Sequence, residues 1–119
     1  MFDTMSREFV RIPSFDAKWK QLGLNDDDLR KLELMILENP KIGPVIRGTG
    51  RARKVRFPFE NRGKSGSARV IYVDFEVDEK VFLLDVYAKA SLDNLSQADR
   101  NDLKILVDYL EDVLKKERK

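Results

Sequence analysis

The chain has 119 residues, of which 42% are hydrophobic and 37% are charged, and it contains neither cysteine nor histidine. This size suits one domain over residues 1–119. The composition excludes disulfides, thiol or imidazole catalysis, and the usual zinc and copper sites. No apolar run approaches 18 residues and no secretory signal pattern begins the chain, so we expect a cytoplasmic protein with no membrane partner, metal or other cofactor.

A short strand is predicted over residues 7–12, where apolar residues alternate before a proline. Two helices are predicted to follow it. Ser14 can cap the first helix, which Gly23 ends. Asn25 can cap the second, because three aspartates follow it at the positive end of the helix dipole. An Asn–Pro pair ends this second helix, and the two helices are expected to form a hairpin lying on a sheet.

The middle of the chain is predicted to be β-structure, with strands over residues 44–48, 51–58, 67–76 and 80–88. The segment EKVFLLDVY is nearly continuous in apolar residues, as expected for a central strand covered on both faces.

A last helix is predicted to reach about residue 116, after a capping box formed by Ser96 and Asp99. The predicted fold class is therefore α+β. It has two N-terminal helices, a central antiparallel sheet of four to five strands and a C-terminal helix, with the helices on one side of the sheet.

Positive charge is concentrated between residues 47 and 72, which hold eight lysines and arginines against one glutamate, although the whole chain carries only +2. Apolar and aromatic residues are interleaved with these cations, which indicates strands and not a disordered basic tail. So much like charge on folded strands is unfavourable unless a polyanion shares the surface. Nucleic acid is the expected partner.

Three blocks occur in order: NPKIGPVIRGTGRARKVRF, GKSGSARVIYVDF and VFLLDVYAKASLDNLS. Together, over roughly residues 8–105, they resemble the RelE/HigB-type toxins of bacterial toxin–antitoxin modules, in particular the subgroup with GTG and GKSG signatures. The resemblance implies a microbial-RNase-like α+β fold and a ribosome-dependent endoribonuclease that cuts mRNA in the ribosomal A site and inhibits translation and growth. It also implies a cognate antitoxin, which we expect to be a small helix-turn-helix DNA-binding protein.

Metal-independent RNA cleavage uses the 2′-OH of the substrate as nucleophile, so the protein must move two protons and stabilise the extra charge on the phosphorane. The resemblance places the catalytic basic pair on Lys54 and Arg56, whose spacing puts both on one sheet face. It places the group that binds the scissile phosphate on Arg69. The last basic position, an arginine general acid in better-studied relatives, falls on Lys89. Some relatives have the lysine base at position 56, so here either Lys54 is the base or the base is missing.

Five further cations are expected either to position RNA phosphates or to be ordinary surface: Arg47, Arg51, Arg53, Arg62 and Lys64. Tyr72 and Tyr87, and Phe15 with Trp19, are expected to be core residues. One alternative stays open, namely a catalytically weak RNA- or antitoxin-binding regulator of the same fold. The toxin is favoured because all four catalytic candidates are basic.

Overall fold

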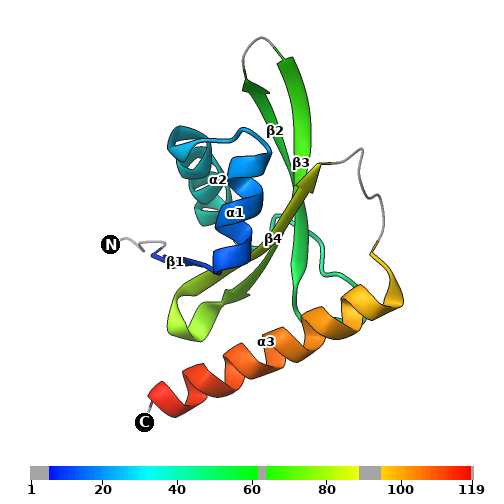
Figure 1. The fold of residues 1–119 in the computed structure, drawn as a ribbon. Coiled ribbons are helices and arrows are strands. Elements are labelled where there is room, and N and C mark those ends of the chain that lie inside the picture. The colour runs from blue at the N-terminus through cyan, green and yellow to red at the C-terminus, as the bar shows by residue number, and fades with distance from the viewer. Residues whose placement is uncertain (1–5, 62–63, 89–94, 119) are drawn as a thin grey trace.

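The computed structural model describes residues 6–61, 64–88 and 95–118, without the side chains of residues 61, 64 and 65. Two layers of helix enclose one sheet (Figure 1). The elements are β1 (Glu8–Arg11), α1 (Pro13–Gln21), α2 (Asp26–Glu38), β2 (Arg53–Asn61), β3 (Lys64–Phe75), the 3-10 turn η1 (Glu76–Asp78), β4 (Lys80–Ala88) and α3 (Gln97–Glu117). The predicted α+β class is confirmed. In this described part, no helix is long and apolar enough to cross a membrane.

The sheet has the strand order β1-β4-β3-β2. Strands β2, β3 and β4 are antiparallel, as predicted, but β1 joins β4 in parallel, with Glu8 opposite Lys80. The prediction of a wholly antiparallel sheet is wrong for this edge. Only strands joined by a short turn must run antiparallel, and a strand that returns after a long connection can pair in either direction.

The strand predicted over residues 44–48 does not form. Within it, Val45 makes one isolated bridge to Arg53. The chain turns instead at Gly48 and Gly50, whose φ angles of 86° and 87° lie in the left-handed region that favours glycine.

Both faces of the sheet are apolar, because β3 alternates two sets of hydrophobic side chains. Val70 and Tyr72 face α1 and α2, whereas Ile71 and Val73 lie in a second cluster with Val107 of α3. The prediction that all helices lie on one side of the sheet is therefore wrong. A sheet with two apolar faces has to be covered on both.

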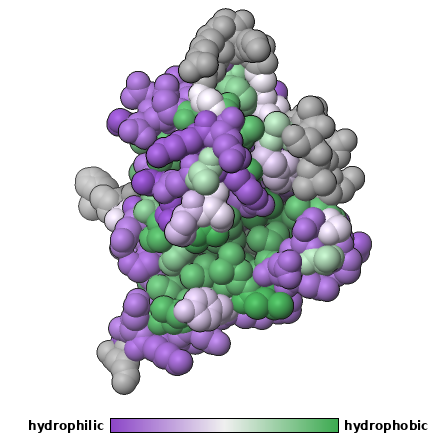
Figure 2. Space-filling model, viewed as in Figure 1, coloured by the Kyte–Doolittle hydropathy of each residue, from purple (hydrophilic) through white to green (hydrophobic). Residues whose placement is uncertain are grey.

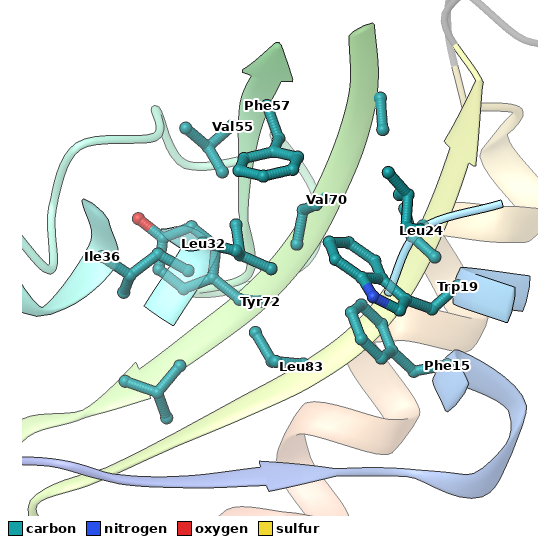
Figure 3. Packing of buried hydrophobic residues seen from close by; sticks show 13 residues of the cluster. Phe15, Trp19, Leu24, Leu32, Ile36, Val55, Phe57, Val70, Tyr72 and Leu83 are labelled. Carbon is teal, nitrogen blue, oxygen red and sulfur yellow. The ribbon is translucent and has the colours of Figure 1, made fainter. Parts of the chain in front are cut away.

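The larger core lies between the sheet and the helical hairpin (Figure 3). Trp19 stacks on Phe15 with ring centroids 5.5 Å apart and touches Phe57 of β2 at 5.7 Å. Its indole N–H donates a hydrogen bond of 3.1 Å to the carbonyl oxygen of Asn25, in the link between α1 and α2. The expectation that Phe15 and Trp19 join helix to sheet is confirmed.

Local signals fix the starts of α2 and α3. Asn25 and Asp28 exchange side-chain to backbone hydrogen bonds at the start of α2, and Ser96 and Asp99 do the same for α3. The predicted cap of α1 is wrong, because Ser14 lies inside the helix. Here the helix begins at Pro13, whose fixed φ and missing N–H suit the first helical position.

One outer edge of the sheet, at the start of β2, is covered by the segment over residues 40–46. The buried Tyr72 hydroxyl accepts a hydrogen bond of 3.1 Å from the Gly43 N–H and donates one of 2.9 Å to the Pro40 carbonyl. Burial raises the pKa of Tyr72, so the hydroxyl stays protonated as a donor. The backbone N–H of Lys54 donates to the Pro44 carbonyl at 3.1 Å. These bonds fix the backbone that carries Lys54.

Strand β1 is held by side chains from late in the chain. The Arg7 guanidinium makes two hydrogen bonds to Asp74 of β3, at 2.7 and 3.3 Å, and both side chains are largely buried. The carboxylate of Asp74 raises the pKa of Arg7. Lys80 of β4 pairs with Glu8 at 2.6 Å. The N-terminal strand thus depends on partners more than sixty residues away.

Truncation of Leu32 to alanine should destabilise the protein by about 2–5 kcal/mol, because this fully buried side chain of α2 would leave a cavity under the hairpin. The matched control is Leu34→Ala on the same helix, where the side chain is 55% exposed, and its effect should stay within about 0.5 kcal/mol. Urea unfolding of both variants measures the difference. Equal unfolding midpoints would contradict the packing of α2 on the sheet.

Candidate active site and nucleic-acid interface

Lys54 and Arg56 project from the same face of β2. Between and after them, Val55 and Phe57 are buried in the core under α1 and α2. Because side chains alternate along a strand, the two cations point to the opposite face, the one on which α3 packs. Arg56 is exposed and Lys54 is half-buried.

Arg69 brings a third cation to that face from β3. It stands between Ala68 and Val70, which both belong to the core under the hairpin, so its own side chain points toward the α3 side. The register places Arg69 directly opposite Arg56. Lys54, Arg56 and Arg69 together form what we call the three-cation cluster.

The three-cation cluster begins where the apolar part of this face ends. Along β3, Phe75, Val73 and Ile71 are buried against α3, and the next side chain on that side is Arg69. Directly before β2, Ala52 is buried with the same apolar residues under α3, and Lys54 follows on the same side. The sheet face therefore changes from apolar to cationic within one residue pair.

Electrostatics of the cluster favour an anionic ligand. Like charges directly opposite each other on two strands are destabilising, and Arg56 and Arg69 are such a pair. The Nη1 atom of Arg69 is also buried without a hydrogen-bond partner among the described residues. A guanidinium presents five donors and can bind a phosphate through two of them. A phosphate here would relieve the repulsion and satisfy the buried donor.

A groove of about 680 Å³ runs along the edge of the sheet next to the cluster. Arg56 belongs to both the groove and the cluster. The other lining residues come from α2, β2 and β3: Asp28, Lys31, Phe57, Pro58, Phe59, Glu60, Gly66 and Ser67. A chain bound at the cluster can therefore continue over the edge of β2.

The five cations expected to position RNA are distributed differently. Arg51 donates to the Asp74 carbonyl at 3.0 Å and lies 4.7 Å above the ring of Phe75, and Arg53 donates to the Gly43 carbonyl at 2.7 Å. Both guanidinium groups thus bind backbone carbonyls of the protein itself, and the proposed site does not include them. Arg47 is exposed on the turn before β2.

Lys89, Arg62 and the side chain of Lys64 lie outside the described residues, so their predicted roles stay predictions.

One cation of α3, Arg100, was not among the site residues predicted from the sequence. Arg100 lies in the first turns of α3, and its Nε atom is buried without a hydrogen-bond partner among the described residues. A cation so close to a helix N-terminus is opposed by the helix dipole. Since helix N-termini favour anionic side chains, an arginine at this position of the predicted helix was the feature that could have pointed to it.

The arrangement can bind and stabilise a phosphate that gains negative charge. It combines one lysine, which can carry or release a proton, with two arginines that stay charged. Among the described residues, no group of three or more acidic side chains is arranged to hold a metal ion. The three cations can themselves stabilise negative charge on a phosphate held between them.

No protein-family model matches the sequence. Among solved structures, the chain is similar to the E. coli toxin RelE in the free state, determined as an arginine-to-alanine double mutant. The TM-score is 0.51 and the identity is 21%, over 72% of this chain and 87% of that chain. At this identity the likeness concerns the fold. The α+β architecture described above is thus a RelE-like fold.

Proposed function

We propose that the protein is the toxin of a bacterial toxin–antitoxin module and acts as a ribosome-dependent endoribonuclease on mRNA. The observation that carries this proposal is the three-cation cluster, where Arg56 and Arg69 stand opposite each other with Lys54 on the same face. The RelE-like fold supports it, because the similar structure is that of a toxin. The sequence blocks that resemble RelE/HigB toxins span the strands that carry the cluster.

In the proposed reaction, the 2′-oxygen of the substrate forms a bond to phosphorus as the bond from phosphorus to the 5′-oxygen breaks. Arg69 binds the scissile phosphate, and Arg56 stabilises the charge that develops on it. Lys54 takes the proton of the 2′-OH as general base, and Lys89 gives a proton to the departing 5′-oxygen. The products are a 2′,3′-cyclic phosphate and a 5′-hydroxyl end.

The proposed site of action is the A site of the translating ribosome in the cytoplasm. The three-cation cluster would contact phosphate and not bases. Phosphate contacts position a nucleic acid, whereas base contacts give sequence preference. The ribosome would present the mRNA strand to the cluster in an extended form.

Induced expression without an antitoxin should arrest growth, because cleaved mRNA stops translation. Mapping of mRNA 5′ ends in these cells should show new ends within translated codons, each with a 5′-hydroxyl. In a purified mixture, the same cuts should require ribosomes and persist in a chelator once ribosome integrity is maintained separately. Normal colonies at confirmed soluble expression would contradict the toxin. Cuts in naked RNA at equal rate would contradict the ribosome dependence.

Lys54→Ala and Arg69→Ala should each slow mRNA cleavage at least about tenfold, because removal of a charge-stabilising or proton-transfer group typically costs a factor of ten or more. The matched control is Arg30→Ala, which removes an exposed arginine of α2 whose partner Asp27 lies at 3.7 Å. Cleavage is measured in a purified translation mixture, and urea unfolding confirms that each variant folds. Full activity in both cluster variants would show that the site lies elsewhere.

An antitoxin is the second proposed partner, and apolar surface next to α3 is its proposed docking site. Figure 2 shows an apolar surface between α3 and the helical hairpin, in contrast to the polar cover of that hairpin. On α3 itself, Ile105 and Tyr109 are 68% and 63% exposed and lie one turn apart. Large exposed apolar side chains that adjoin one another mark an interaction site.

The protein should therefore copurify with the small DNA-binding product of a neighbouring gene. Ile105→Asp with Tyr109→Asp should weaken this complex at least about tenfold, since charged groups would be buried on binding. Leu34→Asp is the control, because Leu34 is an exposed leucine on the other helical layer. Titration calorimetry gives the affinities. A complex weakened equally by the control, or by neither change, would exclude α3 as the docking surface.

A further inference from the structure

Arg100, near the N-terminus of α3, has a side chain for which the described part of the structure gives no hydrogen bond or ion pair. Arg100 follows the capping box of Ser96 and Asp99 by one residue. The neighbouring carboxylate of Asp99 accepts the backbone N–H of Ser96 and so serves the cap. The next basic residue of the helix, Lys104, pairs with Asp108 at 3.1 Å. Lys104, unlike Arg100, therefore has an ion-pair partner, and it serves as the control for Arg100 below.

Arg100 lies beside the turn before β2. A Cβ atom on Gly48 would lie 3.9 Å from Cδ of Arg100, so the arginine side chain passes over this glycine with room for little more than a methyl group between them. Gly48 has a φ of 86°, which a larger residue adopts only with strain. Arg100 is partly exposed, while its Nε–H is buried without a hydrogen-bond partner among the described residues.

Arg100 shares this property with Arg69. Each has one guanidinium nitrogen buried without a partner among the described residues. Arg69 points to the side of the sheet that α3 covers, and Arg100 belongs to α3 itself. A buried donor left unpaired is unfavourable, and native structures pair nearly all such groups. An anion with several acceptor oxygens satisfies such donors, and it is also attracted to the positive end of the α3 dipole.

We propose that Arg100 contacts a second phosphate of the RNA strand, next to the scissile phosphate bound by Arg69. This inference rests on the proposed function, because Arg69 is placed on the scissile phosphate there. Arg100 is a positioning residue that fixes the strand from the α3 side, while the three-cation cluster holds it from the sheet. The strand then lies between β2–β3 and the first turns of α3.

The test measures binding of a single-stranded RNA oligonucleotide at several salt concentrations, together with kcat and KM for cleavage on ribosomes programmed with mRNA. Each phosphate contact contributes about 0.7 to the slope of log affinity against log salt for single strands. Arg100→Ala should lower the slope by about this amount and raise KM at least about tenfold with little change in kcat, as expected for lost uniform binding.

Two further variants separate contact from structure. Arg100→Lys keeps the charge but loses the Nε donor, so it should keep the salt slope while its affinity falls. It also gives a result if Arg100→Ala fails to fold. Lys104→Ala, one turn along the same helix, should leave both the slope and KM unchanged.

An Arg100→Ala variant that folds and keeps the slope of the wild type would overturn the inference. So would an equal loss in Lys104→Ala, or no RNA binding by the wild type. If the wild type binds RNA and loses slope with Arg100→Ala but cleaves no mRNA, the ribonuclease proposal fails and the phosphate contact stands. If it cleaves mRNA and the slope is unchanged, the contact fails alone.

Discussion

The alternation of apolar side chains along β3 is the constraint on which the other parts of the structure depend. Val70 and Tyr72 require a cover on one face, and Ile71 and Val73 require one on the other. Hydrophobic burial is the dominant favourable term in folding, and neither face of a central strand can be left to water. The helical hairpin and α3 are the two covers. Their positions follow from this pattern more than from any preference of the helices themselves.

The same constraint decides where charge can gather. Apolar cover on the α3 side ends at Ile71, and the next position on that side is Arg69. Opposite Arg69, β2 supplies Arg56 instead of a hydrophobic partner. Repulsion between such groups is a cost to the free energy of folding, and proteins accept costs of this kind where a ligand later offsets them. The three-cation cluster thus lies where the apolar pattern of the sheet ends.

Local patterns in the sequence were sufficient for much of the fold. The capping boxes that start α2 and α3, the three antiparallel strands and the shared face of Lys54 and Arg56 all depend on residues close together in the chain. The direction of β1 and the face chosen by α3 depend on distant segments, and no local spacing encodes them. The same holds for the site. The sequence shows that Arg51 and Arg53 are close to the cluster along the chain. Only the folded structure shows that their guanidinium groups donate hydrogen bonds to backbone carbonyls instead of facing the cluster.

The pairing of β1 with β4 has a consequence for the order of folding. Glu8 must wait for Lys80, 72 residues later, before the first strand has a neighbour. Contacts between residues so far apart in sequence form late and slow the folding of a domain. During synthesis β4 and α3 emerge after β1 and the helical hairpin, so β1 has no strand to pair with, and the α3 side of the sheet has no cover, until these later elements have emerged.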